Sequence, residues 1–191
     1  MELDRALEQL ADVHAHLLRA QPFAGYRAQP VAWTAVCALV AAALQPHLAP
    51  ATDLGFVAYW ASVAALCAVV SLVDVIRCSL RSGAAWRETK LAVRQLLPAL
   101  AVGAVLTAVL LPSGIGWLPG VWCLLFGLGV LASVPFLPRR LDVVGHFYLL
   151  VGTVLLVTTD RFGVPSPWSV GLPFACGQAG AAWLLRREDW R

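Results

Sequence analysis

Five ionisable side chains inside or beside apolar stretches have the clearest potential for chemistry: Asp74, Arg77, Arg94, Asp142 and His146. Asp142 and His146 are four residues apart, so on a helix they share one face. A carboxylate next to an imidazole can orient the ring for proton transfer. One interpretation is therefore a polar vestibule open to the cytoplasm, in which all five side chains meet and His146 is the deepest.

The same five residues also allow a purely structural interpretation. Asp74 could pair with Arg77 or Arg94 at the membrane interface, and Asp142 suits the first turn of a helix, where the dipole favours a carboxylate. His146 would then only extend its polar ring towards the interface. We favour this interpretation, because each residue is within about two turns of the interface, where a charge is tolerated.

No catalytic, metal-binding or cofactor-binding set is predicted elsewhere in the chain. His14 and His16 are two residues apart, which on a helix places them about 200° apart, too far round to share one metal ion. The cysteines are scattered through apolar segments, which favours small buried side chains over disulfides or a zinc site. They are Cys37, Cys67, Cys78, Cys123 and Cys176.

The composition predicts the elements that must position these residues. Of the 191 residues, 60% are apolar and 13% charged, and the mean hydropathy is +0.75, whereas soluble domains are about 45–50% apolar and about 25% charged. We expect an all-α integral membrane protein with six transmembrane helices in three consecutive hairpins. The expected organisation is an amphipathic cytoplasmic helix at 1–21, a linker at 22–29, a transmembrane domain at 30–185 and a basic tail at 186–191. The six spans are placed at about 30–49, 54–76, 94–111, 115–137, 141–159 and 167–185.

The distribution of basic residues predicts the orientation. Of the 14 Lys and Arg residues, all except Arg161 fall in the segments that six spans would place on one side of the membrane. Basic residues near span ends mark the cytoplasmic side. Both termini are therefore expected in the cytoplasm, with the chain in the inner membrane of a bacterium. Because the basic residues lie between apolar segments, the net charge of +3 does not indicate nucleic-acid binding.

Small residues recur at helical spacing in the third and sixth spans and predict faces for close helix packing. These residues are Ala99, Gly103, Thr107, Gly171, Ala175 and Ala179. Residues 103–129 and 152–180 also share several glycine, valine and leucine matches. Either a duplication of one hairpin or the composition alone would explain them, and both explanations stay open.

The first 21 residues give the best indication of partners. A leucine-rich face is formed by Leu3, Leu7, Leu10, His14 and Leu17. This segment has a net negative charge and the loop at 77–94 a net positive one, so the two could dock within one chain or across a homo-oligomer. Alternatively, the leucine face binds another membrane protein or a cytosolic protein.

These observations favour a non-enzymatic accessory or regulatory membrane protein that acts through helix contacts and its cytoplasmic face. The first alternative is a small oligomeric transporter or channel with a cytoplasmic polar vestibule. The second is a membrane-embedded enzyme acting on a lipid or quinone, which ranks last because no carboxylate pair, metal set or activated nucleophile shares one depth. No cofactor is expected for any of these functions. The lipid bilayer is the first expected partner.

Overall fold

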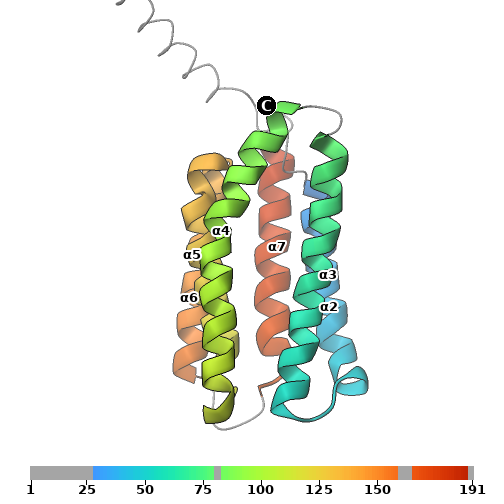
Figure 1. Cartoon of the computed structure of the whole chain (residues 1–191), viewed down its shortest axis with the longest axis vertical. Coiled ribbons are helices and arrows are strands. Elements are labelled where there is room, and N and C mark those ends of the chain that lie inside the picture. The colour runs from blue at the N-terminus through green and yellow to red at the C-terminus, as the bar shows by residue number, and fades with distance from the viewer. Residues whose placement is uncertain (1–27, 80–82, 159–164, 189–191) are drawn as a thin grey trace, which may run out of the picture.

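The computed structural model describes residues 28–79, 83–158 and 165–188, and Figure 1 shows that these residues form a bundle of long helices. The α-helices are α2 (Ala28–Leu48), α3 (Asp53–Ser79), α4 (Gly83–Leu110), α5 (Leu118–Ser133), α6 (Asp142–Thr158) and α7 (Trp168–Glu188), and the short 3-10 helices are η1 (Leu111–Ser113), η2 (Val134–Phe136) and η3 (Arg139–Leu141). The three described ranges contain no strand, which confirms the all-α prediction. The leucine-rich face at 1–21 lies outside the described residues.

Each of the six predicted apolar segments coincides with a helix, but the boundaries differ where local propensity extends a helix beyond the apolar run. The predicted loop at 77–94 is largely helical, because α3 continues to Ser79 and α4 begins at Gly83. Residues 84–92 are rich in alanine, arginine, glutamate, lysine and leucine, which are strong helix formers. The connection between α3 and α4 is therefore much shorter than predicted.

Four helical segments are long and apolar enough to cross a membrane: Ala28–Leu48, Asp53–Arg77, Lys90–Ser113 and Leu118–Phe136. α6 is apolar but has 17 residues, and α7 has 21 residues with several small and polar side chains. Large apolar side chains point outward from the bundle, such as Val105, which is 62% exposed, and Val157, which is 81% exposed. Soluble proteins rarely expose extensive apolar surface. The helices thus fit a membrane protein.

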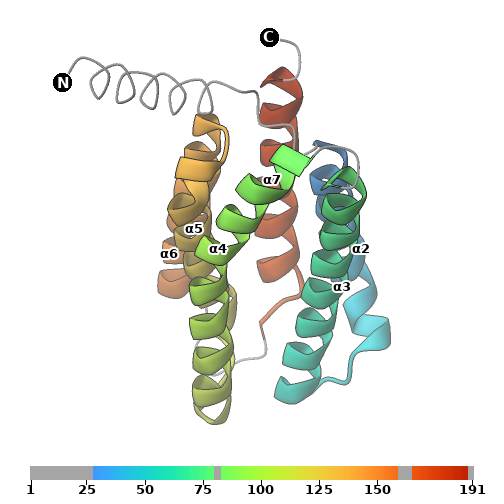
Figure 2. The same cartoon turned by 45° about the horizontal axis from the view of Figure 1, so that its top comes forward.

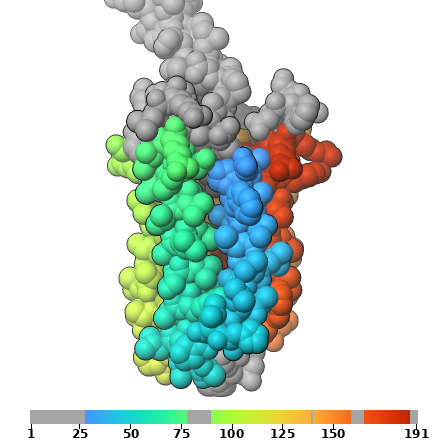
Figure 3. Space-filling model, turned by 90° about the vertical axis from the view of Figure 1, so that its right-hand side faces the viewer, coloured from blue at the N-terminus to red at the C-terminus, as the bar shows by residue number. Residues whose placement is uncertain are grey.

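The helices form a closed ring. Each helix runs antiparallel to the one before it and packs against it, and α7 returns to pack along α2 (Figures 1 and 2). Seen from the side, α2 lies between α3 and α7 (Figure 3). The N-terminal ends of α2, α4 and α6 therefore share one end of the bundle with the C-terminal ends of α3, α5 and α7.

We call this the basic end, and the opposite end the far end. Every Lys and Arg among the described residues lies in the half of the bundle nearer the basic end. The basic side chains whose surroundings are described are all exposed. They are Arg77, Lys90, Arg94, Arg140, Arg186 and Arg187.

Glycines bring helix backbones into direct contact. A methyl group added at Gly152 of α6 would lie 2.9 Å from the carbonyl oxygen of Gly120 in α5. One added at Gly127 would lie 2.9 Å from the carbonyl oxygen of Gly145. Close approach of this kind gives membrane helices dispersion contacts where lipid provides no hydrophobic drive. The α5–α6 pair is therefore the tightest contact between chain neighbours.

Aromatic side chains fill the interior between the levels of these two contacts. Tyr148 of α6 is fully buried, with its ring centroid 5.0 Å from that of Phe126 in α5 and 5.3 Å from that of Phe174 in α7. Edge-to-face and tilted geometries of this kind suit the ring quadrupoles. A second cluster towards the far end is built around Phe56 and Trp60 of α3. The bundle therefore has a packed interior at two levels.

The glycine contact between α5 and α6 leads to a stability prediction. We expect Gly152→Ala to lower the thermal midpoint in detergent, because its methyl group would meet Gly120 and Leu124 at 2.9 Å. Overpacking of this kind costs about 1–3 kcal/mol. Gly180→Ala in α7 is the matched control: nothing lies within 4 Å of its added methyl group. It should leave stability unchanged or raise it by about 0.5–1 kcal/mol. Equal midpoints for the two variants would contradict the assigned contact.

Candidate functional site

The five predicted polar residues lie in separate places and form no common cluster. Asp74 and Arg77 lie on α3 facing the start of α2, Arg94 is exposed on α4, and Asp142 and His146 lie on α6. α3 and α6 stand on opposite sides of α7 (Figures 1 and 2). The sequence indicated a shared depth for these residues but not which helices would be neighbours. A vestibule lined by all five is therefore not formed.

Asp142 and His146 share a helix face, but their charged groups do not meet. One Asp142 carboxylate oxygen accepts a hydrogen bond from the Val143 backbone N–H at 2.7 Å. His146 Nδ1 donates to the Asp142 backbone carbonyl at 2.8 Å, and the ring is exposed. The carboxylate thus satisfies an amide at the start of α6, as helix-start carboxylates do. The geometry gives the pair a local role in the first turns of this helix.

The small residues predicted on the third span face α5. Thr107 donates to the Gly103 carbonyl at 2.7 Å and accepts from Trp122 Nε1 at 2.9 Å. A methyl group added at Gly103 would contact Leu125 at 3.5 Å, and one added at Gly129 would lie 3.2 Å from Ala99. The Ser133 hydroxyl of α5 also donates to the Ala92 carbonyl of α4 at 3.0 Å. Polar bridges and close van der Waals contact therefore join α4 to α5.

The small residues predicted on the sixth span only partly share a buried face. Gly171 packs against Ala38 and Ala42 of α2, and Ala175 is buried, but Ala179 is exposed. A strict spacing of four residues rotates about 40° per step round a helix with 3.6 residues per turn. After two steps the third residue has left the interface. Ala182, which is buried, continues the face instead and was missed.

α2 and α3 are joined by hydrogen bonds towards the far end. The Tyr59 hydroxyl donates to the Ala41 carbonyl at 2.8 Å. Trp60 Nε1 donates to Gln45 Oε1 at 2.7 Å, and both of these side chains are buried. These hydrogen bonds connect the C-terminal half of α2 to the N-terminal part of α3.

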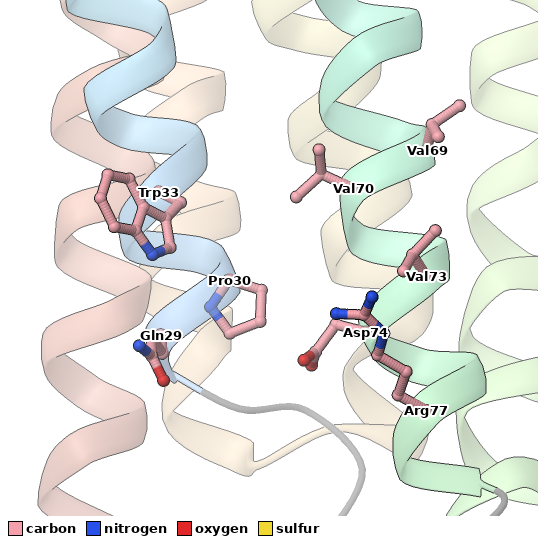
Figure 4. A pocket seen from close by; sticks show the side chains of 8 residues that line it. All are labelled: Gln29, Pro30, Trp33, Val69, Val70, Val73, Asp74 and Arg77. Atoms are coloured by element: carbon pink, nitrogen blue, oxygen red, sulfur yellow. The ribbon is translucent and has the colours of Figure 1, made fainter.

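A groove with a volume of about 440 Å³ separates the two helices at the basic end. Figure 4 shows apolar side chains along its walls and polar side chains at its mouth. The lining residues are Gln29, Pro30, Trp33, Val69, Val70, Val73, Asp74 and Arg77. We call this cavity the α2–α3 groove.

Asp74 is the unusual residue of the α2–α3 groove. Its carboxylate is half-buried and points into the space between the two helices (Figure 4). Arg77 lies one turn further along α3, and its side chain folds back so that the guanidinium reaches the level of Asp74 (Figure 4). No hydrogen bond or ion pair joins Asp74 to another side chain in the described part of the chain. The groove therefore presents a carboxylate and a guanidinium, of opposite charge, at one level.

Two cysteines mark the α2–α3 interface between its hydrogen bonds and its groove. Cys37 in α2 and Cys67 in α3 lie near each other across this interface. Both are half-buried free thiols, whereas Cys123 is buried and Cys176 exposed. Scattered cysteines were expected from the sequence, because it carries no signal that α2 and α3 are neighbours at this depth. Among the described residues, no three His, Cys, Asp or Glu side chains could hold one metal ion.

The α2–α3 groove is suited to binding. Its walls provide apolar contact area, and its mouth provides one carboxylate, one guanidinium, an amide and an indole N–H. No family model, curated protein or solved structure matches this chain. The functional interpretation therefore depends on this geometry.

The cysteine contact leads to a test of the α2–α3 register. Mild oxidation of the protein in its membrane should join Cys37 to Cys67, because the two thiols lie near each other across the α2–α3 interface. Mass spectrometry of non-reduced peptides should detect this link. Cys37→Ser should abolish it, and a Cys123→Ser, Cys176→Ser double variant should retain it. Preferential linkage of any other cysteine pair would contradict the register.

Proposed function

We propose that this chain is a non-enzymatic accessory or regulatory integral membrane protein that acts through helix contacts and its cytoplasmic face. In this proposal α2 to α7 each cross the inner membrane of a bacterium, giving six spans in three hairpins. Both termini lie in the cytoplasm, on the side of the basic end. The chain is not an enzyme in this proposal, and it assembles as a homo-oligomer or with another protein.

The packed interior between α5, α6 and α7 is the observation that carries this proposal. Tyr148 occupies the centre of these three helices, and its hydroxyl donates to the Phe174 carbonyl at 3.3 Å. A methyl group added at Gly177 would collide with the Tyr148 ring, so α7 closes tightly over it. Transporters instead place polar or ionisable groups along a path near the bilayer midplane. Aromatic packing at this place supports a contact function over the alternative of transport.

The alternating helix directions and the basic end support the proposed topology. Antiparallel helices with all described Lys and Arg residues in one half of the bundle match the distribution that the positive-inside rule requires. α6 is short for a membrane span; 17 residues at a rise of 1.5 Å span about 25 Å, slightly less than a hydrocarbon core of about 30 Å. Local thinning of the bilayer accommodates a mismatch of this size at modest cost.

Residues 1–21 are the proposed partner-binding element. The described chain begins at Ala28, at the basic end, so the proposal assigns this segment to the same side of the membrane. Exposed Lys90 and Arg94 of α4 provide positive charge there, and the segment carries net negative charge. Charge complementarity of this kind orients an encounter, while a leucine face supplies the contact energy.

The topology is tested by reporter fusions. Alkaline phosphatase, which is active only outside the cytoplasm, should be active when fused within 50–52 or 113–116, and inactive when fused at 81, 138 or 191. Neutralising the basic residues of the α3–α4 region should weaken this pattern, because these residues hold the hairpin ends inside. They are Arg77, Arg81, Arg87, Lys90 and Arg94. Arg161→Gln is the control and should change nothing; an unchanged pattern in the neutralised variant would contradict the charge argument.

The partner role is tested by affinity purification of the full chain in mild detergent, followed by mass spectrometry. A second, differently tagged copy of the chain distinguishes self-association from capture of another protein. We expect deletion of 1–21, or the double variant Leu7→Asp, Leu10→Asp, to lower recovery of the partner at least about tenfold, the loss that about 1.4 kcal/mol of binding free energy produces. His16→Ala, which leaves the leucine face intact, is the matched control. Equal recovery from the deletion variant would exclude this role.

A further inference from the structure

The α2–α3 groove opens sideways, towards the surface that the helices present to lipid. Trp33 is 59% exposed and Val69 is 57% exposed, although both line the groove. Neighbouring outward side chains on the same helices, such as Val36 and Leu66, are also apolar and exposed. A ligand of this groove would therefore enter from the bilayer.

The size of the groove favours a small molecule over a helix of another protein. An α-helix is about 10–12 Å across and rises 5.4 Å per turn, so about one turn would fill 440 Å³. The volume instead falls in the range of about 300–1,000 Å³ that small-molecule sites occupy. One segment of a lipid, with its headgroup at the mouth and part of an acyl chain along the walls, matches this volume and the apolar lining.

The charges at the mouth select the kind of headgroup. Asp74 and Arg77 carry opposite charges at the same level of the groove (Figure 4), and the exposed side chain of Gln29 at the start of α2 also lines it. An anionic headgroup would satisfy Arg77 but bring its phosphate next to the Asp74 carboxylate. A headgroup with both a phosphate and an ammonium matches both charges, and the Gln29 amide can donate to the phosphate.

We propose that the α2–α3 groove binds an aminophospholipid with an ethanolamine headgroup. Arg77 and Gln29 hold the phosphate, Asp74 holds the ammonium, and Trp33, Val70 and Val73 contact the acyl chain. The lipid thereby supplies the compensating charge for a half-buried carboxylate that no described side chain pairs. This inference goes beyond the proposed partner role, because it concerns another surface and needs no second protein.

The test uses the full chain reconstituted in bilayer nanodiscs of equimolar phosphatidylethanolamine and phosphatidylglycerol. The protein is then taken into mild detergent, and the lipids that remain bound are quantified per protein by mass spectrometry. Wild-type protein should retain phosphatidylethanolamine in preference to phosphatidylglycerol. Asp74→Asn should reduce this preference about fivefold, the factor that an interfacial ion pair carries at the upper end of its usual range. Asp74→Glu should restore it.

Two further variants separate the headgroup contact from the apolar contact. Arg77→Gln should lower retention of both phospholipids, and Val70→Trp, which fills the groove, should lower both as well. Asp53→Asn at the far end and Lys90→Gln at the basic end are matched controls outside the groove, and neither should alter the ratio.

One measurement needs no variant and so does not depend on whether the substituted proteins fold. Replacing phosphatidylethanolamine by its N-acetyl derivative removes the ammonium charge and should abolish the preference in the wild-type protein. The proposal is overturned if wild-type protein shows no preference, if the N-acetyl lipid is retained equally, or if Asp53→Asn acts like Asp74→Asn. Because the readout is bound lipid, none of these results bears on the partner role of residues 1–21.

Discussion

Where α5 meets α6, Gly120 faces Gly152 and Gly127 faces Gly145, and the backbones of the two helices are in direct contact. Apolar side chains gain nothing from leaving lipid, so membrane helices depend on such close fits for their association. A close contact between small residues also joins α7 to α2, through Gly171, Ala38 and Ala42. These two tight pairs form the rigid part of the bundle, and α3 and α4 are arranged around it with more of their surface exposed.

The α2–α3 groove follows from a different kind of contact. α3 is joined to α2 by the long side chains of Tyr59 and Trp60, which reach across to a carbonyl and an amide oxygen towards the far end. No glycine contact of α3 with α2 occurs at the basic end among the described residues, and Trp33 and Val70 occupy the facing positions there. Bulky side chains that cannot interdigitate leave a gap. Asp74 and Arg77 therefore lie beside an open cavity.

The all-α fold could be predicted from the sequence because apolar runs of about 20 residues are a direct physical requirement of the bilayer. The shared helix face of Asp142 and His146 was also readable from spacing, but their hydrogen bonds to backbone groups were not. The position of Asp74 near one end of its span was predictable, whereas the start of α2 as the other wall of its groove was not. Neighbour relations between helices depend on packing among distant segments, and a single sequence carries little information about them. Ala179 shows the same limit within one helix. The spacing of four residues predicted that it lies in the packed face, but the helix turns it out of that face, and it is exposed.

The contact between α2 and α7 has a consequence for how the chain assembles. Ala42 and Gly171 are separated by four intervening helices, so the first described helix of the bundle receives its principal neighbour only after the last one has been synthesised. Until then the small-residue face of α2 is covered by acyl chains, and only its hydrogen bonds to α3 hold it in place. Contacts between such distant segments slow folding, because the loop-closure entropy must be overcome before the contact forms. The bundle is therefore completed late, when α7 packs along α2.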